Sequence, residues 1–215
     1  MNDFQIPLIQ ALAITFLLST FLNYIIYKFS KNISFQKKEK QKRLSTQLIP
    51  PFGGIACSLA FLISTRLIGK ADDNFIFIGF FAVIISILGV VDDIYNLKWY
   101  VKLFFQIFLV SYPLYSLKLF INLESLIGIE LNNNLNFLVS TFWVILIINS
   151  INFIDNMDGL AVVVSGSICL QVAFVSNYLN QYKLTDISLL LFTSIVGFFI
   201  FNFPPAKLYL GDSGS

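Results

Sequence analysis

The sequence contains no histidine and only two cysteines among its 215 residues. Both cysteines, Cys57 and Cys169, lie in apolar segments, and neither belongs to a Cys-x-x-Cys pattern. Without histidine, these residues cannot form a serine–histidine or cysteine–histidine catalytic dyad, or the usual Cys/His zinc site. The cysteine spacing also gives no disulfide framework.

Charged side chains are scarce as well. They make up 12% of the chain while hydrophobic residues reach 57%, and a soluble domain typically has about 25% charged residues. The formal net charge of +2 is too small to suggest a nucleic-acid partner. The composition therefore predicts a protein whose main surroundings are a lipid bilayer.

Long apolar runs recur along the chain, and each is long enough to cross about 30 Å of hydrocarbon. The first run has no basic segment before it and no cleavage signal, so we expect a retained helix rather than a signal peptide. The expected helices are 6–28, 48–68, 75–91, 101–121, 136–153, 159–179 and 186–203. The predicted fold is all-α: a polytopic membrane protein with about seven transmembrane helices in a single domain, residues 1–215.

One connecting segment, residues 28–43, is strongly basic, with seven Lys or Arg and one Glu. The positive-inside rule places this segment in the cytoplasm and the N-terminus outside. Successive connections then alternate, and Asp92, Asp155 and Asp212 all fall on the cytoplasmic face. Because acidic residues have little influence on topology, the rule did not force this grouping. We expect a multi-pass protein of the inner (plasma) membrane with a cation site at its cytoplasmic surface.

The adjacent pair Asp92-Asp93 directly follows the apolar run 75–91. Two neighbouring carboxylates repel each other, and the repulsion grows near a low-dielectric core. A divalent cation would relieve it, and Mg²⁺ prefers such hard oxygen ligands. The pair is either the solvated end of a helix or half of a metal site, and the pair alone does not decide between them.

Asp155 and Asp158 stand three residues apart in "NSINFIDNMDGLA", which places them on the same side of a helix turn. Aspartate is a favoured helix N-cap, so the two residues could simply begin the next helix. A helix N-terminus also attracts anions, and an aspartate-rich one suggests a phosphate bridged by a metal ion. Both interpretations stay open on the residues alone.

Pro204 and Pro205 end the last expected helix, and the polar turn that follows contains Lys207 and Asp212. By itself "GDSG" is typical of an ordinary loop. A serine-hydrolase interpretation of Ser213 fails because no histidine is available as its base.

Gly53 and Gly54 stand near the start of the second expected helix, in "PPFGGIA". Glycines there most often allow close helix packing, and the alternative is backbone access for a ligand at the inner surface. Lys102, near the start of the fourth expected helix, is by itself typical of a positive-inside anchor.

Taken in order, "PPFGGIA", "GVVDDIYNLKWYVKLFFQ", "NFIDNMDGLA" and "NFPPAKLYLGDSGS" resemble the signatures of the polyprenyl-phosphate N-acetylhexosamine-1-phosphate transferases. This membrane superfamily also contains the phospho-N-acetylmuramoyl-pentapeptide transferases. The resemblance runs from about residue 42 to the end of the chain. It implies transfer of a sugar-1-phosphate from a UDP-sugar to a lipid-carrier phosphate, with Mg²⁺ (or Mn²⁺) as cofactor, giving a polyprenyl-pyrophosphoryl sugar and UMP.

The resemblance also implies roles for individual residues. The expected catalytic residues are Asp92, Asp93, Asp155 and Asp158. The expected substrate-binding residues are Lys102, Asn152, Asn202, Gly53, Gly54 and Lys207. The expected metal ligands are Asp92 and Asp212.

The short spacing from aspartate pair to lysine in "DDIYNLKWYVK" looks like the branch that uses UDP-N-acetylglucosamine or a related UDP-N-acetylhexosamine. The expected acceptor is undecaprenyl (polyprenyl) phosphate, and the product would initiate cell-envelope polysaccharide synthesis, for the cell wall or for lipopolysaccharide. A homodimer is compatible with this expectation.

Two departures from the family pattern are visible. Ser45 stands where the family usually has a histidine, and the family continues for several helices and a cytoplasmic loop beyond the position of Ser215. We therefore expect a chain truncated at its C-terminus relative to the family. Two other functions stay open: a cation-coupled transporter that uses the aspartates as ion ligands, and an inactive remnant of the transferase.

Overall fold

The computed structural model describes residues 7–30, 49–68, 72–128, 130, 132–155 and 157–214. Most of the basic segment 28–43, and Ser45, lie outside the described residues. The described residues form helices and no strand: α1 (Leu8–Ser30), α2 (Gly53–Ile68), α3 (Asp73–Tyr95), α4 (Trp99–Leu117), α5 (Leu123–Ile127), α6 (Asn133–Ile154), α7 (Leu160–Tyr178) and α8 (Tyr182–Asn202). The predicted all-α, polytopic membrane architecture is confirmed.

Six of the described helices are long and apolar enough to cross a membrane, namely α1, α3, α4, α6, α7 and α8. The expected second spanning helix is shorter than predicted, because α2 begins at Gly53 and has 16 residues. The preceding Pro50 and Pro51 lack the amide hydrogens that helical hydrogen bonds use, and both lie outside the helix.

The connection between α4 and α6 also differs from expectation. The fourth expected helix ran to residue 121, but α4 ends at Leu117, where Lys118 adopts a left-handed conformation with φ of 53°. The short helix α5 was not predicted. Its cap residue Asn122 accepts hydrogen bonds from the backbone N–H groups of Glu124 and Ser125, a local arrangement that apolar runs do not indicate.

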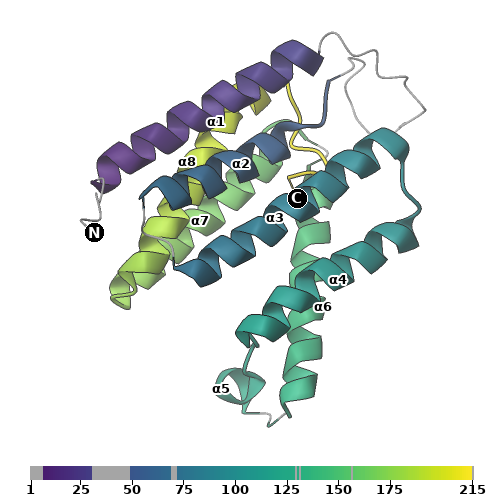
Figure 1. The fold of residues 1–215 in the computed structure, drawn as a ribbon, viewed down its shortest axis with the longest axis vertical. Helices are drawn as coiled ribbons and strands as arrows, with labels where there is room; N and C mark the ends of the chain where they lie inside the picture. The colour runs from purple at the N-terminus through teal and green to yellow at the C-terminus, as the bar shows by residue number, and fades with distance from the viewer. Residues whose placement is uncertain are drawn as a thin grey trace.

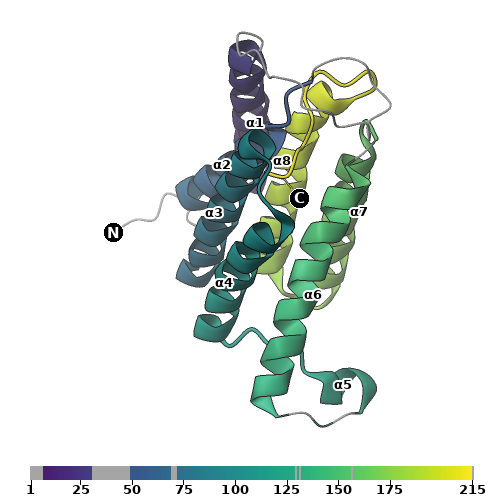
Figure 2. The ribbon, with the colours of Figure 1, turned by 90° about the vertical axis from the view of Figure 1, so that its right-hand side faces the viewer.

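The long helices lie side by side in a bundle (Figures 1 and 2). Helices α1, α2 and α8 contact one another, α7 lies along α8, and α3 lies along α2. Helices α4 and α6 contact each other, with α5 at their far end. The core is formed by fully buried residues such as Leu190, Phe198 and Leu208. Small buried residues on α1 and α2, including Ala11 and Ala56, let these helices approach closely.

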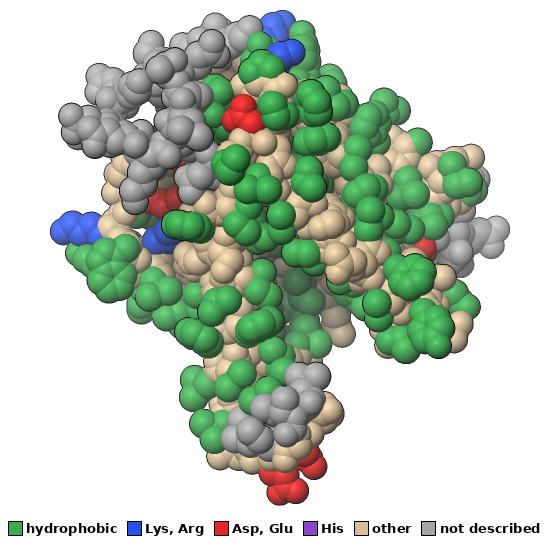
Figure 3. All heavy atoms as spheres, turned by 180° about the vertical axis from the view of Figure 1, so that it is seen from behind, with side chains coloured by type: hydrophobic (Ala, Val, Ile, Leu, Met, Phe, Trp, Pro, Cys, Tyr) green, Lys and Arg blue, Asp and Glu red, His purple; other side chains and the backbone are tan. Residues whose placement is uncertain are grey.

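The outer surface of the bundle is apolar. Large hydrophobic side chains stay exposed on several helices, among them Phe108, Phe142 and Phe174. Figure 3 shows hydrophobic side chains spread over the described part of one face, with only a few charged groups among them. A helical bundle with an apolar mantle suits a lipid environment, where only internally satisfied backbone is tolerated.

After α8 the chain turns back into the molecule. We call residues 203–214 the C-terminal segment. Its backbone pairs with the residues that precede and begin α2: Tyr209 N–H donates to Pro50 O, while Gly53 N–H and Gly54 N–H donate to Tyr209 O and Leu210 O, each at 3.0 Å. This return path brings Asp212 to the polar end of the bundle.

Candidate active site

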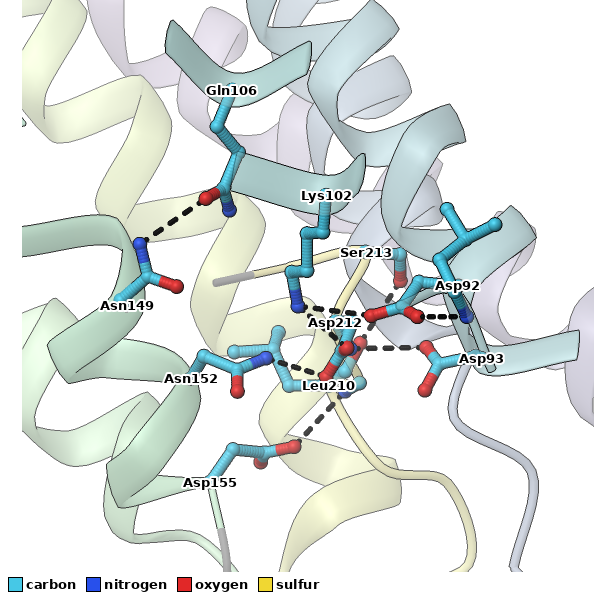
Figure 4. Close-up of polar contacts among 12 residues, drawn as sticks. Asp92, Asp93, Lys102, Gln106, Asn149, Asn152, Asp155, Leu210, Asp212 and Ser213 are labelled. Carbon is cyan, nitrogen blue, oxygen red and sulfur yellow. Dashed lines mark hydrogen bonds and ion pairs between the residues drawn. The ribbon is translucent and has the colours of Figure 1, made fainter. Parts of the chain in front are cut away.

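The polar side chains predicted from separate motifs meet at one end of the bundle (Figure 4). This end contains the last turn of α3, the first turn of α4, the α6–α7 junction and the C-terminal segment. The structure thus brings together residues that are more than a hundred positions apart in sequence.

The centre of the site is a three-residue charge cluster, which we call the Asp92–Lys102–Asp212 cluster. The Lys102 ammonium lies 3.1 Å from Asp92 Oδ2 and 2.7 Å from Asp212 Oδ2. The three side chains are only 12 to 19% exposed. The Lys102 ammonium therefore lies between the carboxylates of Asp92 and Asp212. The three groups are largely shielded from solvent, and charge interactions there are stronger than in water.

The turn between α3 and α4 makes this meeting possible. Asn96 closes α3 in a left-handed conformation with φ of 50°, and its N–H donates to Asp92 O. Leu97 N–H donates to Asp92 Oδ1 at 2.8 Å, which fixes the orientation of the carboxylate. After Lys98, α4 begins, and Lys102 lies one turn into it. The chain reversal therefore places the Lys102 ammonium against Asp92.

Asp212 is held as an anion. Burial opposes its ionisation, but the hydrogen bonds that Lys102 and Asn152 donate to it and the positive charge of Lys102 outweigh burial, so the pKa of Asp212 lies well below its ordinary value. The Asn152 side-chain amide donates to Asp212 Oδ1. Asp212 is thus a preformed acceptor for cations at neutral pH.

The other predicted acids contact the backbone of the C-terminal segment. Asp93 Oδ2 accepts from Asp212 N–H at 3.0 Å, and Asp155 Oδ2 accepts from Gly211 N–H at 3.0 Å. Asp158 Oδ2 accepts from Ala206 N–H at 2.9 Å. Asp93 and Asp155 thus contact the segment at or next to Asp212, whereas Asp158 contacts it six residues earlier.

Asn202, at the end of α8, is fully buried and makes two contacts. Its Oδ1 accepts from Gly159 N–H, and its Nδ2 donates to Leu208 O, both at 2.9 Å. The side chain therefore joins the start of α7 to the C-terminal segment.

The two glycines of the "PPFGGIA" motif serve close packing. A Cβ at Gly53 would press into the ring of Phe198, and one at Gly54 would overlap the backbone of Gly214. Their N–H groups donate to Tyr209 O and Leu210 O, so both are used within the chain. A ligand-binding role for the two residues stays a prediction.

Lys207 lies apart from the cluster. Its side chain is exposed and forms no ion pair with the carboxylates that the structure describes. Its backbone N–H donates to Phe201 O at 2.7 Å. Of the predicted substrate-binding residues, only Lys102 and Asn152 are seen in contact with Asp92 or Asp212 in the part of the chain that the structure describes.

Two residues near the centre were not predicted. Gly89 lies one turn before Asp92 on α3, where a Cβ would overlap the carbonyl oxygen of Asp212. Gln106, only 3% exposed, accepts from the Asn149 side chain at 3.2 Å and thereby ties α4 to α6. Only helical spacing could have indicated these residues from the sequence. Gly89 precedes Asp92 by three residues and Gln106 follows Lys102 by four, so each lies on the same helix face as its charged neighbour.

Asp92 and Asp212 are the residues of the cluster that could hold a Mg²⁺ ion, and only together with oxygens from a substrate. Mg²⁺ typically takes one or two carboxylates together with substrate phosphates and waters, and Asp92 and Asp212 offer that oxygen set. Among the described residues there is no group of three or more His, Cys, Asp or Glu side chains arranged to hold a metal ion. Substrate oxygens would therefore have to supply further ligands.

Comparison with known proteins finds one family model and several transferases that are similar to this chain. The model of glycosyl transferase family 4 matches residues 75–215. Over 221 residues the chain is 25% identical to a probable undecaprenyl-phosphate N-acetylglucosaminyl 1-phosphate transferase of Bacillus subtilis (strain 168). The alignment covers 100% of this chain and 61% of that protein.

Two further relatives extend the comparison. An undecaprenyl-phosphate alpha-N-acetylglucosaminyl 1-phosphate transferase of Thermotoga maritima is 27% identical, over 93% of this chain and 58% of its own length. A phospho-N-acetylmuramoyl-pentapeptide-transferase of Lactobacillus gasseri is 29% identical, over 98% of this chain and 71% of its own length. The chain thus spans about 60% of the length of the first two relatives.

Proposed function

The chain belongs to glycosyl transferase family 4, and from this premise we propose that it takes part in transferring a sugar-1-phosphate from a UDP-sugar to a polyprenyl phosphate. The proposed donor is UDP-N-acetylglucosamine or a related UDP-N-acetylhexosamine, and the acceptor is undecaprenyl phosphate. The products are a polyprenyl-pyrophosphoryl sugar and UMP. This reaction would initiate cell-envelope polysaccharide synthesis.

The observation that carries the proposal is the Asp92–Lys102–Asp212 cluster at one end of an apolar bundle. Both reactants are phosphates and repel each other. Phosphoryl transfer is accelerated mainly by positioning the reactants in line and by neutralising their charge. The buried Lys102 ammonium, with the Asp92 and Asp212 carboxylates beside it, suits both tasks. A site at the ends of membrane helices suits undecaprenyl phosphate, which stays in the membrane.

The step itself exchanges two bonds to phosphorus. An oxygen of the lipid phosphate attacks the β-phosphorus of the UDP-sugar, and the bond from that phosphorus to the bridging oxygen breaks. The bridging oxygen leaves with UMP. Lys102 would contact a phosphate, and Asp92 would assist the attacking lipid phosphate. We favour Asp92 over Asp93 for this role because Asp92 Oδ2 lies 3.1 Å from the ammonium of Lys102, the proposed phosphate contact.

Asp92 and Asp212 would hold Mg²⁺, which when bound supplies positive charge to the pyrophosphate. Mn²⁺, with the same preference for oxygen ligands, could replace it. Asn152, which donates to Asp212, would keep that carboxylate oriented.

The proposed setting is the inner membrane, with the site on the cytoplasmic face. The supporting observation is the sequence bias: the strongly basic segment 28–43 follows the first helix and is separated by one helical hairpin from the Asp92 connection. A homodimer stays a prediction.

A cation-coupled transporter is the second candidate, and the depth of the acids favours the transferase. Intramembrane ion ligands of a transporter are expected near mid-bilayer. Here Asp92 lies in the last turn of α3, Asp155 caps α6, and Asp212 lies outside the helices. No described aspartate of the site interrupts a helix at its middle.

We expect membranes containing the protein to convert labelled UDP-N-acetylglucosamine into a lipid-extractable product when undecaprenyl phosphate is present. A chelator should abolish the conversion, because the site offers two carboxylates and relies on the metal for further charge. Added Mg²⁺ should restore it. Conversion that persists in excess chelator would overturn the metal part of the proposal.

Absence of lipid product from any UDP-N-acetylhexosamine would overturn the transferase proposal and favour the inactive remnant. Cation-dependent uptake of a solute into sealed vesicles, without lipid product, would favour the transporter instead.

A further inference from the structure

The acids around the charge cluster divide into two groups by what they contact. Asp92 and Asp212 contact the Lys102 ammonium. Asp93 and Asp155 each accept a hydrogen bond from a backbone N–H of the C-terminal segment, as does Asp158. The motif resemblance placed Asp93, Asp155 and Asp158 together with Asp92 as catalytic residues, so this division comes from the structure.

The three backbone contacts fall at successive points of the segment. Asp158 holds Ala206, Asp155 holds Gly211, and Asp93 holds Asp212. The carboxylates come from two places, the last turn of α3 and the α6–α7 junction, on both sides of the segment. A carboxylate that accepts from a backbone N–H makes a charge-assisted hydrogen bond, which is stronger than a neutral one.

The segment is also held closely by backbone packing. Gly211 has φ of 73°, in the left-handed region that favours glycine, and a Cβ there would overlap Pro51 O and lie 2.7 Å from Asp93 Oδ2. Asp155 itself is only 2% exposed. The backbone that carries Asp212 is therefore fixed between the start of α2, the end of α3 and the α6–α7 junction.

We propose that Asp93, Asp155 and Asp158 are positioning residues, which hold the backbone of the C-terminal segment so that Asp212 faces Lys102. This inference rests on the proposed function only where it predicts a change in transfer activity. The contact needs an oxygen acceptor and not a full negative charge, and an asparagine side chain supplies such an oxygen through Oδ1. A group that acts as a base or metal ligand needs the charge itself.

The test compares neutral variants that keep the acceptor with variants that remove it. Asp155→Asn and Asp158→Asn should keep transfer activity within about tenfold of the parent, whereas Asp155→Ala and Asp158→Ala should lose about 10²-fold or more, the usual cost of misplaced catalytic groups. The same pattern is expected for Asp93. The matched control is Asp72→Ala, which removes an exposed ion pair with Lys183 at the other end of the bundle and should change neither readout.

A second readout follows the segment directly and does not depend on activity. Ser213 is 2% exposed, so a Ser213→Cys thiol should react slowly with a soluble maleimide in the parent, after subtraction of labelling at buried Cys57 and Cys169. Labelling should stay slow in the Asn variants and become at least tenfold faster in the Ala variants.

Each outcome is decisive. Asn variants that stay protected but lose activity as fully as the Ala variants would show a need for charge and overturn the positioning role. Ala variants that keep Ser213→Cys protected would overturn it as well. If the parent itself shows no transfer, the proposed function fails, while the labelling pattern still decides whether these acids hold the segment.

Discussion

Replacing Asp212 with asparagine should lower the rate of transfer by about 10²- to 10³-fold, the range seen when one preorganised electrostatic group is removed from an active site. Asp212 is the carboxylate on which Lys102 and Asn152 both converge. Asparagine has nearly the same shape but no charge, so the Lys102 ammonium would lose an anionic partner, and so would the Mg²⁺ ion that we propose. The loss should appear in kcat at saturating donor.

The variant separates charge from structure. Because the backbone N–H groups of residues 211 and 212 are bonded to Asp155 and Asp93, the C-terminal segment should stay in place in Asp212→Asn. A Ser213→Cys thiol should therefore stay protected although activity falls. Asp72→Asn, at the opposite end of the bundle, serves as the control and should retain full activity. Transfer by Asp212→Asn at more than half the parent rate would contradict the assigned role.

The second large effect is expected from Gly89→Ala. A Cβ on this turn of α3 would overlap the carbonyl oxygen of Asp212 and lie 2.5 Å from Ser213 Cα, both backbone groups that cannot rotate away. Overpacking of this kind typically costs about 1–3 kcal/mol in the free energy of unfolding. We expect a lower melting temperature in detergent and at least a tenfold loss of transfer, because the segment that carries Asp212 must shift.

Gly166→Ala is the matched control for this substitution. Gly166 also lies inside a long apolar helix, α7, but a Cβ there would be 3.5 Å from the ring of Phe192, an ordinary contact. Alanine is favoured over glycine in a helix by about 1 kcal/mol, so this variant should be as stable as the parent or more so. Equal melting temperatures and equal activities for Gly89→Ala and the parent would show that the close approach at Gly89 is not required.

The helices were predictable because a membrane span requires a long apolar run, and seven of the eight described helices follow such runs. The family, inferred from four ordered motifs, is confirmed by the match over residues 75–215. What apolar runs could not indicate were the late start of α2 at Gly53 and the short α5, since backbone hydrogen bonds and a local cap decide these.

The site was predictable as a set of residues but not as a network. Charge bias and helix order brought Asp92, Lys102 and Asp212 to one end. The partners of Asp155 and Asp158 depend on how the chain folds back after Pro205, a tertiary path that no local pattern specifies. The role of Gly89 likewise depends on which backbone passes its face of α3.

The most direct test of the account follows the β-phosphate of the donor. Membranes containing the protein and undecaprenyl phosphate would be supplied with UDP-N-acetylglucosamine labelled with ³²P in its β-phosphate. If the Asp92–Lys102–Asp212 cluster supports sugar-1-phosphate transfer, the label enters the lipid fraction and unlabelled UMP is released, and both signals are lost in Asp212→Asn. Release of labelled UDP, with sugar but no label in the lipid, would contradict the account.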